Sequence, residues 1–198
     1  MKTKTSLDVK KLTCLAMLTA LVVVLQFAGS FIKLGMFSVS LVLVPIVVGA
    51  AICGPIAGGW LGFVFGLIVL LSGDATAFLT IDPFGTIVTV LVKGALSGFV
   101  SGLVYRFLER FNRYVAVFAS AIMCPIVNTG IFLVGCLLFF MDTIKEWASS
   151  LGYASAGSYM IIGLAGGNFL FELLFNLLLA PAIVTLISLA SKLVRNKK

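Results

Sequence analysis

The sequence predicts an all-α integral membrane protein: one bundle of six transmembrane helices with its N- and C-termini in the cytoplasm. Of the 198 residues, 61% are hydrophobic and only 11% are charged, against about 25% charged residues in a soluble domain. The apolar residues fall into six runs that approach or exceed the roughly 20 residues of a membrane span. Most Lys and Arg residues lie in three polar stretches that six spans would place on one side.

The expected spans cover residues 12–29, 39–53, 55–72, 84–105, 115–141 and 159–191, all within a single domain, 1–198. The first run is too long for a signal peptide, whose apolar region is about 7 to 15 residues, so we expect a retained helix. Gly54-Pro55 suits a tight turn between the second and third spans. The polar segment 73–83 separates the third span from the fourth. The last two runs exceed one membrane thickness, which predicts tilt.

The distribution of basic residues sets the expected orientation. Cytoplasmic loops of membrane proteins are enriched in Lys and Arg, and the outer connections here hold only Lys33 and Lys145. The remaining basic residues outside the spans are Lys2, Lys4, Lys10, Lys11, Arg106, Arg110, Arg113, Lys192, Arg195, Lys197 and Lys198. Because they flank apolar spans, we expect them to contact lipid headgroups of the bilayer and not nucleic acid. The predicted location is the plasma membrane of a bacterial cell.

Two charged residues lie inside apolar runs. A charged group at the centre of a bilayer costs about 2.5 to 3.5 kcal/mol on insertion scales, so it must face the protein interior or a wet cavity. At about 1.5 Å per residue, Lys93 lies about 14 Å and Glu172 about 20 Å from the outer ends of their spans. Asn128 lies at a similar depth in the fifth span. These depths predict a polar cavity that opens outward between the last three spans.

The sixth run places further polar residues on the same face. Asn168, Glu172 and Asn176 are spaced by four, so they line one side of a helix. Pro125 precedes Asn128 by three residues, and a proline inside a helix frees a backbone carbonyl that needs another partner. The predicted substrate-binding residues are Lys93, Asn128, Asn168, Glu172 and Asn176. The alternative is a non-transporting scaffold or regulatory helix bundle in which Lys93 and Glu172 form a structural ion pair.

Enzymatic chemistry is not expected. The chain has no histidine, which excludes a Ser-His pair, a His-ligated zinc site and an imidazole base. Asp74 and Asp82 lie in one predicted outer loop and cannot face each other within the membrane as an intramembrane aspartyl protease requires. The four cysteines lie singly, without the spacing of a metal site. We therefore predict no metal and no cofactor.

Small residues recur at four-residue spacing in three of the runs. These are Ala16 and Ala20 in the first, Gly58, Gly62 and Gly66 in the third, and Gly94, Gly98 and Gly102 in the fourth. Small residues on one stripe let helices approach closely, which favours packing within lipid. For the glycine stripes we favour contacts inside the bundle over a partner interface.

The chain resembles the substrate-binding S components of energy-coupling factor (ECF) vitamin transporters. The resemblance rests on six predicted spans in about 200 residues, a basic N-terminus leading into Ala16-Met-Leu-Thr-Ala20, and the Gly- and Pro-rich stretch from Val44-Pro45 to Gly62. It covers nearly the whole chain. In that family the alanine pair marks the surface that docks on the transmembrane coupling subunit, which implies this role for Ala16 and Ala20.

The resemblance also implies a mechanism. An S component binds a vitamin or vitamin precursor at the outer face with high affinity, associates with the coupling subunit and two cytoplasmic ATPase subunits, and releases the substrate inward. The loop between the first two helices closes over the substrate, which implies a lid at Phe31, Lys33, Met36 and Phe37. Residues 72–83 are a second candidate lid.

The predicted site residues leave several vitamins open. Lys93 suits a carboxylate or phosphate, whereas Glu172 and the asparagines suit hydroxyl, amide or ring N–H donors. Pantothenate, folate-like compounds and riboflavin are therefore candidates, and a strongly cationic ligand such as thiamine is less favoured.

Overall fold

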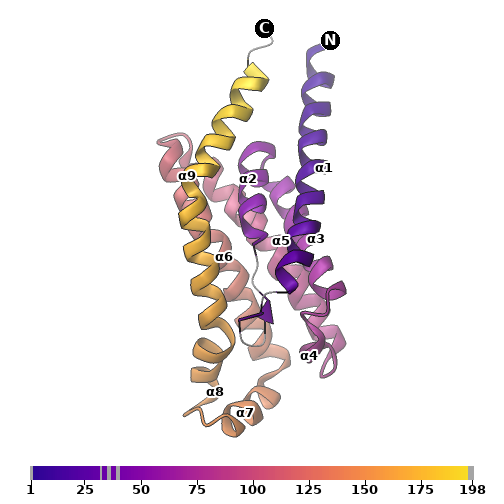
Figure 1. Cartoon of the computed structure of the whole chain (residues 1–198), viewed down its shortest axis with the longest axis vertical. Coiled ribbons are helices and arrows are strands. Elements are labelled where there is room, and N and C mark those ends of the chain that lie inside the picture. The colour runs from indigo at the N-terminus through magenta and orange to yellow at the C-terminus, as the bar shows by residue number, and fades with distance from the viewer. Residues whose placement is uncertain (1, 32, 35–36, 39–40, 196–198) are drawn as a thin grey trace.

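Helices make up almost all of the computed structural model (Figure 1). It describes residues 2–31, 33–34, 37–38 and 41–195, and the side chains of residues 9–31 and 41–188. The elements in chain order are α1 (Lys2–Ser30), β1 (Lys33–Leu34), β2 (Phe37–Ser38), α2 (Leu43–Cys53), α3 (Pro55–Leu71), α4 (Thr76–Leu79), α5 (Pro83–Leu108), α6 (Arg113–Phe139), α7 (Met141–Ser150), α8 (Ala156–Ser158), the π-helix η1 (Tyr159–Gly166) and α9 (Gly167–Arg195).

Within the residues that the structure describes, four helical stretches are long and apolar enough to cross a membrane. They are Val9–Ser30, Pro83–Leu108, Arg113–Phe139 and Ala156–Ser188. Helices α2 and α3 are equally apolar but have only 11 and 17 residues. Helix α2 begins at Leu43 and not near residue 39 as the sequence suggested. It ends where Gly54 takes φ 102°, a backbone conformation that glycine adopts without strain, and Pro55 starts α3.

Helices α3 and α5 pack at backbone distance through the two glycine stripes. A Cβ atom built on Gly62 would overlap the carbonyl oxygen of Gly94, and one built on Gly98 would overlap that of Gly58. Nothing larger than hydrogen fits at these crossings. The stripes therefore hold α3 and α5 together inside the bundle, as the sequence favoured.

Polar side chains fix the ends and the packing of α5 and α6. Asp82 caps α5 by accepting a hydrogen bond from the Gly85 amide at 3.1 Å, and Asn112 caps α6 through the Tyr114 amide at 2.8 Å. Between the helices, the buried hydroxyls of Ser101 and Ser120 lie 2.8 Å apart. Each also donates to the other residue's backbone carbonyl. These reciprocal hydrogen bonds set the register of α6 against α5.

The two ends of the bundle differ. Figure 1 shows both chain termini at one end, where α1 and α9 extend beyond the other helices. The short helices α4, α7 and α8 gather at the opposite end. Helix α7, which the sequence analysis did not predict, buries Ile144 and Ala148 and exposes Asp142 and Lys145. It forms an amphipathic cover over this end.

The last predicted span is not uniform. Its first eight residues, Tyr159–Gly166, form the π-helix η1, and α9 continues from Gly167. A π-helical stretch is rare and is frequently found at functional sites. Here it stands directly beside the cavity described next, to which it contributes Leu164 and Ala165.

Candidate functional site

A cavity lies in the half of the bundle that carries α4 and α7. The space not filled by atoms is about 750 Å³, a figure that includes open solvent at the mouth of the cavity. Residues from α1, the α3–α4 connection and all three later long helices contribute to it. The described lining residues are Gln26, Phe65, Val69, Asp74, Ala75, Phe78, Thr86, Thr89, Val90, Lys93, Asn128, Thr129, Phe132, Phe140, Leu164, Ala165, Asn168 and Glu172.

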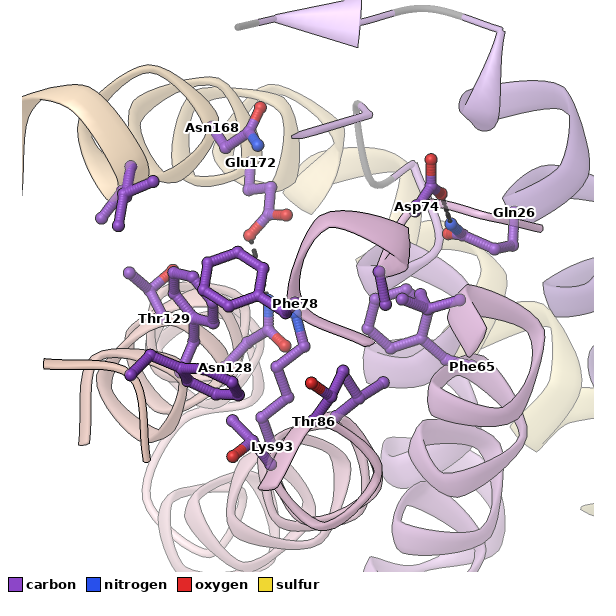
Figure 2. Close-up of a pocket in the computed structure, with 18 residues that line it drawn as sticks. Gln26, Phe65, Asp74, Phe78, Thr86, Lys93, Asn128, Thr129, Asn168 and Glu172 are labelled. Atoms are coloured by element: carbon purple, nitrogen blue, oxygen red, sulfur yellow. Dashed lines mark hydrogen bonds between the residues drawn. The ribbon is translucent and has the colours of Figure 1, made fainter. Parts of the chain in front are cut away.

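One side of the cavity is formed by Asn128 of α6 and Glu172 of α9. Both are buried, with 4% and 5% of their surface exposed. The Asn128 Nδ2 donates to Glu172 Oε2 at 3.4 Å, and Figure 2 shows this contact as a dashed line. An ionised carboxylate can only accept hydrogen bonds, so the NH₂ group of Asn128, and not its oxygen, faces Glu172. Asn128 Oδ1 is then buried without a hydrogen-bond partner among the described residues.

A second carboxylate–amide pair lies on another side of the cavity. Gln26 Nε2 of α1 donates to Asp74 Oδ2 at 2.8 Å, and the Ser72 hydroxyl donates to the same oxygen at 3.0 Å. Gln26 is 1% exposed, and its Oε1 is buried with no partner in the described part of the chain. Figure 2 shows this pair across the cavity from Asn128 and Glu172. The contact ties the C-terminal part of α1 to the segment that follows α3.

Lys93 enters the cavity from α5. Its Nζ lies 5.3 Å from the centroid of the Phe132 ring, close enough for a cation–π interaction. In Figure 2 its side chain rises between Thr86 and Asn128 toward Phe78. The ammonium group therefore sits among the polar side chains and the rings, where its N–H groups can reach a ligand.

Aromatic rings form the wall of the cavity nearest α4 and α7. Phe78 of α4 packs edge-to-face against Phe132, Phe140 and Trp147, with ring centroids 5.8, 4.9 and 5.7 Å away. Trp147 belongs to α7, so the ring cluster joins α4 and α7 over the cavity. This arrangement makes α4 part of the cavity wall, within the segment 72–83 that the sequence suggested as a second lid.

The structure brings four of the five predicted binding residues together. Lys93, Asn128, Asn168 and Glu172 all line the cavity. Asn176 is not among the lining residues. It lies one turn beyond Glu172 on α9, is 1% exposed, and both polar atoms of its side chain lack a partner among the described residues.

The remaining predicted residues lie away from the cavity or outside the described structure. Ala16 and Ala20 are exposed on α1. Of the predicted lid, Phe31 is 87% exposed, and Lys33 and Phe37 lie in the paired strands β1 and β2. Met36 and the side chains of Lys33 and Phe37 lie outside the described residues.

Sequence reasoning missed several polar residues of the cavity. These are Gln26, Asp74, Thr86, Thr89 and Thr129. Asp74 lies in the segment 72–83 that the sequence suggests as a second lid, but no local pattern indicates that this segment contacts α1. A signal was available in Gln26, a large polar residue inside an apolar run. The arrangement as a whole combines hydrogen-bonding groups, three ionisable side chains and aromatic faces around one cavity, a combination that suits a small molecule.

Comparisons with known proteins agree with this architecture. The model of the family "ECF transporter, substrate-specific component" matches residues 10–187. The solved structure of ThiT from Listeria monocytogenes is similar in fold, with a TM-score of 0.67 at 22% identity, covering 94% of this chain and 98% of that one. No curated protein matches the chain. The helical membrane fold, the cavity and the family match over most of the sequence lead to one conclusion: the chain belongs to the family of substrate-specific components of ECF transporters.

Proposed function

We propose that this chain captures a vitamin or vitamin precursor at the outer face of the bacterial plasma membrane, with high affinity, for import by an ECF transporter. The observation that carries the proposal is the convergence of Lys93, Asn128 and Glu172 from three long apolar helices on one cavity. Polar groups are costly inside a membrane and are found there chiefly where they serve a site. Asn168, which lines the same cavity, completes the proposed set of binding residues.

The proposed topology has six membrane spans and cytoplasmic termini. Both termini lie at the same end of the bundle (Figure 1), which an even number of spans requires. In this topology α2 and α3 are the second and third spans. Arg110 lies in the central cytoplasmic connection, and Arg106 and Arg113 lie at the helix ends on either side of it. The cavity lies toward the other end and therefore opens outward.

The proposed partners are a transmembrane coupling subunit and two cytoplasmic ATPase subunits. Ala16 and Ala20 would form the docking surface for the coupling subunit, since both are exposed and small. Leu12 and Val24, 66% and 62% exposed, extend the same stripe at four-residue spacing. Substrate release toward the cytoplasm would depend on this assembly, because energy for import comes from the ATPases.

Vitamin uptake by cells tests the proposal. The chain would be expressed alone, with the coupling and ATPase subunits, and with ATPase subunits that cannot hydrolyse ATP, and a panel of labelled vitamins would be supplied. Uptake of one vitamin is expected only with the intact partners. Native mass spectrometry of the purified chain should show the same vitamin bound. Equal uptake by the chain alone, or no binding of any vitamin, would contradict the proposal.

A further inference from the structure

We infer that the cavity takes a flat heteroaromatic compound whose ring or amino N–H groups donate hydrogen bonds to the side-chain oxygens of Asn128 and Gln26. The inference rests on the proposed function and names the substrate class for the same cavity. It also makes Gln26, which the sequence analysis did not assign to the site, a ligand-binding residue. Two features of the lining support it: buried amide oxygens and the aromatic rings beside them.

The two amides use their NH₂ groups inside the protein. Asn128 Nδ2 donates to Glu172 Oε2 at 3.4 Å, and Gln26 Nε2 donates to Asp74 Oδ2 at 2.8 Å. Because an ionised carboxylate only accepts hydrogen bonds, each contact turns the nitrogen of the amide toward the carboxylate and the oxygen away from it. A flipped amide would set two acceptors against each other and is disfavoured.

The amide oxygens are the groups left over. Asn128 Oδ1 and Gln26 Oε1 are buried, and neither has a hydrogen-bond partner among the described residues. Both residues line the cavity, and Figure 2 shows them on opposite sides of it. Asn168 Oδ1 and the Thr89 hydroxyl, also in the lining, are buried without a partner in the described part of the chain too. Since buried polar atoms are nearly always hydrogen-bonded, we expect a bound ligand to supply their partners.

An acceptor on the protein selects a donor on the ligand. Water that enters the cavity can donate to the amide oxygens, and a ligand that binds there displaces it. A ligand with N–H groups replaces those hydrogen bonds, whereas a ligand that carries only acceptors leaves the oxygens buried and unbonded and so loses affinity. The cavity therefore favours N–H donors over carboxylate and carbonyl groups on both of these sides.

The aromatic rings favour a flat ligand. Phe65, Phe78, Phe132 and Phe140 line the same cavity, and Phe78 packs edge-to-face against Phe132 and Phe140 with centroids 5.8 and 4.9 Å away. A further aromatic ring can join such a cluster by stacking or by an edge-to-face contact. Ring N–H and amino groups on a heteroaromatic ring keep their hydrogens in the ring plane, so a ligand can pack against the phenylalanines while its edge donates to the amides.

Matched pairs of ligands that differ only in their N–H groups test the inference. Riboflavin, thiamine, folate and nicotinamide would each be titrated calorimetrically into the purified full-length chain, beside a derivative whose ring or amino N–H groups on the heteroaromatic part are methylated. At least one parent compound is expected to bind at least about tenfold more tightly than its methylated derivative, a difference of about 1.4 kcal/mol. Lipoate, which has neither an N–H group nor an aromatic ring, should bind more weakly than that parent.

Variants of the two amides separate hydrogen bonding from the bulk of the added methyl groups. Gln26→Leu and Asn128→Leu each remove one acceptor. The parent compound should lose about tenfold in affinity and the methylated derivative much less, because only the parent donates to that oxygen, so the preference between them shrinks. Asn176→Leu, which removes a buried amide outside the cavity lining, is the matched control and should keep the preference.

Two results would overturn the inference. One is equal binding of every parent compound and its methylated derivative. The other is a preference for the parent that neither Gln26→Leu nor Asn128→Leu reduces in folded protein. The two residues lie on different helices, so if one variant does not fold the other still decides, and the ligand pairs test the parent chain in either case.

The outcomes also separate this inference from the proposed function. If the assembled transporter imports lipoate, or another vitamin without N–H groups on a flat ring, the proposed function stands and the inferred substrate class is wrong. If no vitamin binds and none is imported, both are wrong.

Discussion

Three asparagines share the polar character of α6 and α9 but differ in their position relative to the cavity. Asn128 and Asn168 line it, whereas Asn176 is buried one turn beyond. Asn128→Ala or Asn168→Ala should weaken binding by about tenfold or more, because losing one hydrogen-bonding partner typically costs about 1 to 3 kcal/mol.

Asn176→Leu is the matched comparison. It removes two buried polar atoms that have no partner among the described residues, so ligand affinity should be unchanged and thermal stability equal or higher. Calorimetric titration and thermal unfolding of the same three purified variants provide the two measurements. If Asn176→Leu lost as much ligand affinity as Asn128→Ala, Asn176 would belong to the binding site.

The roles of Lys93 and Glu172 can be separated by removing both charges. The double variant Lys93→Met, Glu172→Gln removes one charge of each sign, so it leaves the net charge of the cavity unchanged. If both residues contact the ligand, affinity should fall more than about tenfold while the chain stays folded. If the two form only a structural pair, the double variant should bind like the parent, because replacing both partners of a buried pair is often neutral. Titration and size-exclusion chromatography distinguish these results.

The sequence predicted which residues enter the membrane interior but not all of their neighbours. Depth and helix periodicity were sufficient for Lys93, Asn128 and Glu172, since a charge or amide in an apolar run must face the bundle interior. The Gln26–Asp74 contact joins residues 48 positions apart and depends on how α4 folds back, which no local pattern encodes. The four-residue spacing also grouped Asn176 with Glu172, because helix periodicity shows which residues share a face of α9. It does not show how far along that face the cavity extends.

At the scale of elements, the crossing of α3 and α5 depends on glycine. Gly62→Ala would place a methyl group on the Gly94 carbonyl oxygen, a backbone atom that cannot move aside. Overpacking of this kind costs about 1 to 3 kcal/mol, so the unfolding midpoint should fall by several degrees, at about 2 to 4 °C per kcal/mol.

Gly130→Ala on α6 is the control for the glycine crossing. A Cβ there meets nothing within 4 Å, and alanine favours a helix more than glycine does. This variant should be as stable as the parent or more so. Thermal unfolding in the same detergent checks both changes, and equal midpoints for the two variants would contradict the close-packed crossing.

The exposed stripe of α1 is the element we expect to meet the coupling subunit. Ala16→Trp should reduce co-purification with that subunit strongly, because a large side chain prevents close helix approach. Ligand binding by the isolated chain should persist, since Ala16 is not among the lining residues of the cavity. Ala182→Trp, at an exposed position of α9, is the control and should assemble normally. Normal assembly of Ala16→Trp together with lost ligand binding would contradict this docking surface.

Elements were predictable in proportion to their length. The long apolar runs identified α1, α5, α6 and α9 because burial in lipid requires continuous hydrophobicity. Helix α7 was missed since its sequence, Met141–Ser150, is polar on one face and directly follows an apolar run. The π-helical stretch Tyr159–Gly166 was missed because its residues, apolar apart from glycine and tyrosine, suit an α-helix equally well. Its hydrogen-bond pattern depends on packing against neighbours.

For the whole molecule, charge and shape point to the same orientation. The basic residues cluster near the termini and in the α5–α6 connection, and the two termini share one end of the bundle (Figure 1). The cavity and α7 lie toward the other end. The family match confirms the membrane transport role predicted from the sequence, whereas the number of spans and the side of each end stay predictions.

Labelling of single cysteines in intact cells tests the orientation of the whole molecule. In a variant whose four native cysteines are replaced by alanine, Lys145→Cys would mark α7 and Arg110→Cys the α5–α6 connection. Both positions are exposed. A thiol reagent that cannot cross the membrane should label Lys145→Cys in intact cells and Arg110→Cys only after permeabilisation, because basic connections face the cytoplasm. The reverse pattern would place the cavity on the cytoplasmic side, where it could not capture a vitamin from outside the cell.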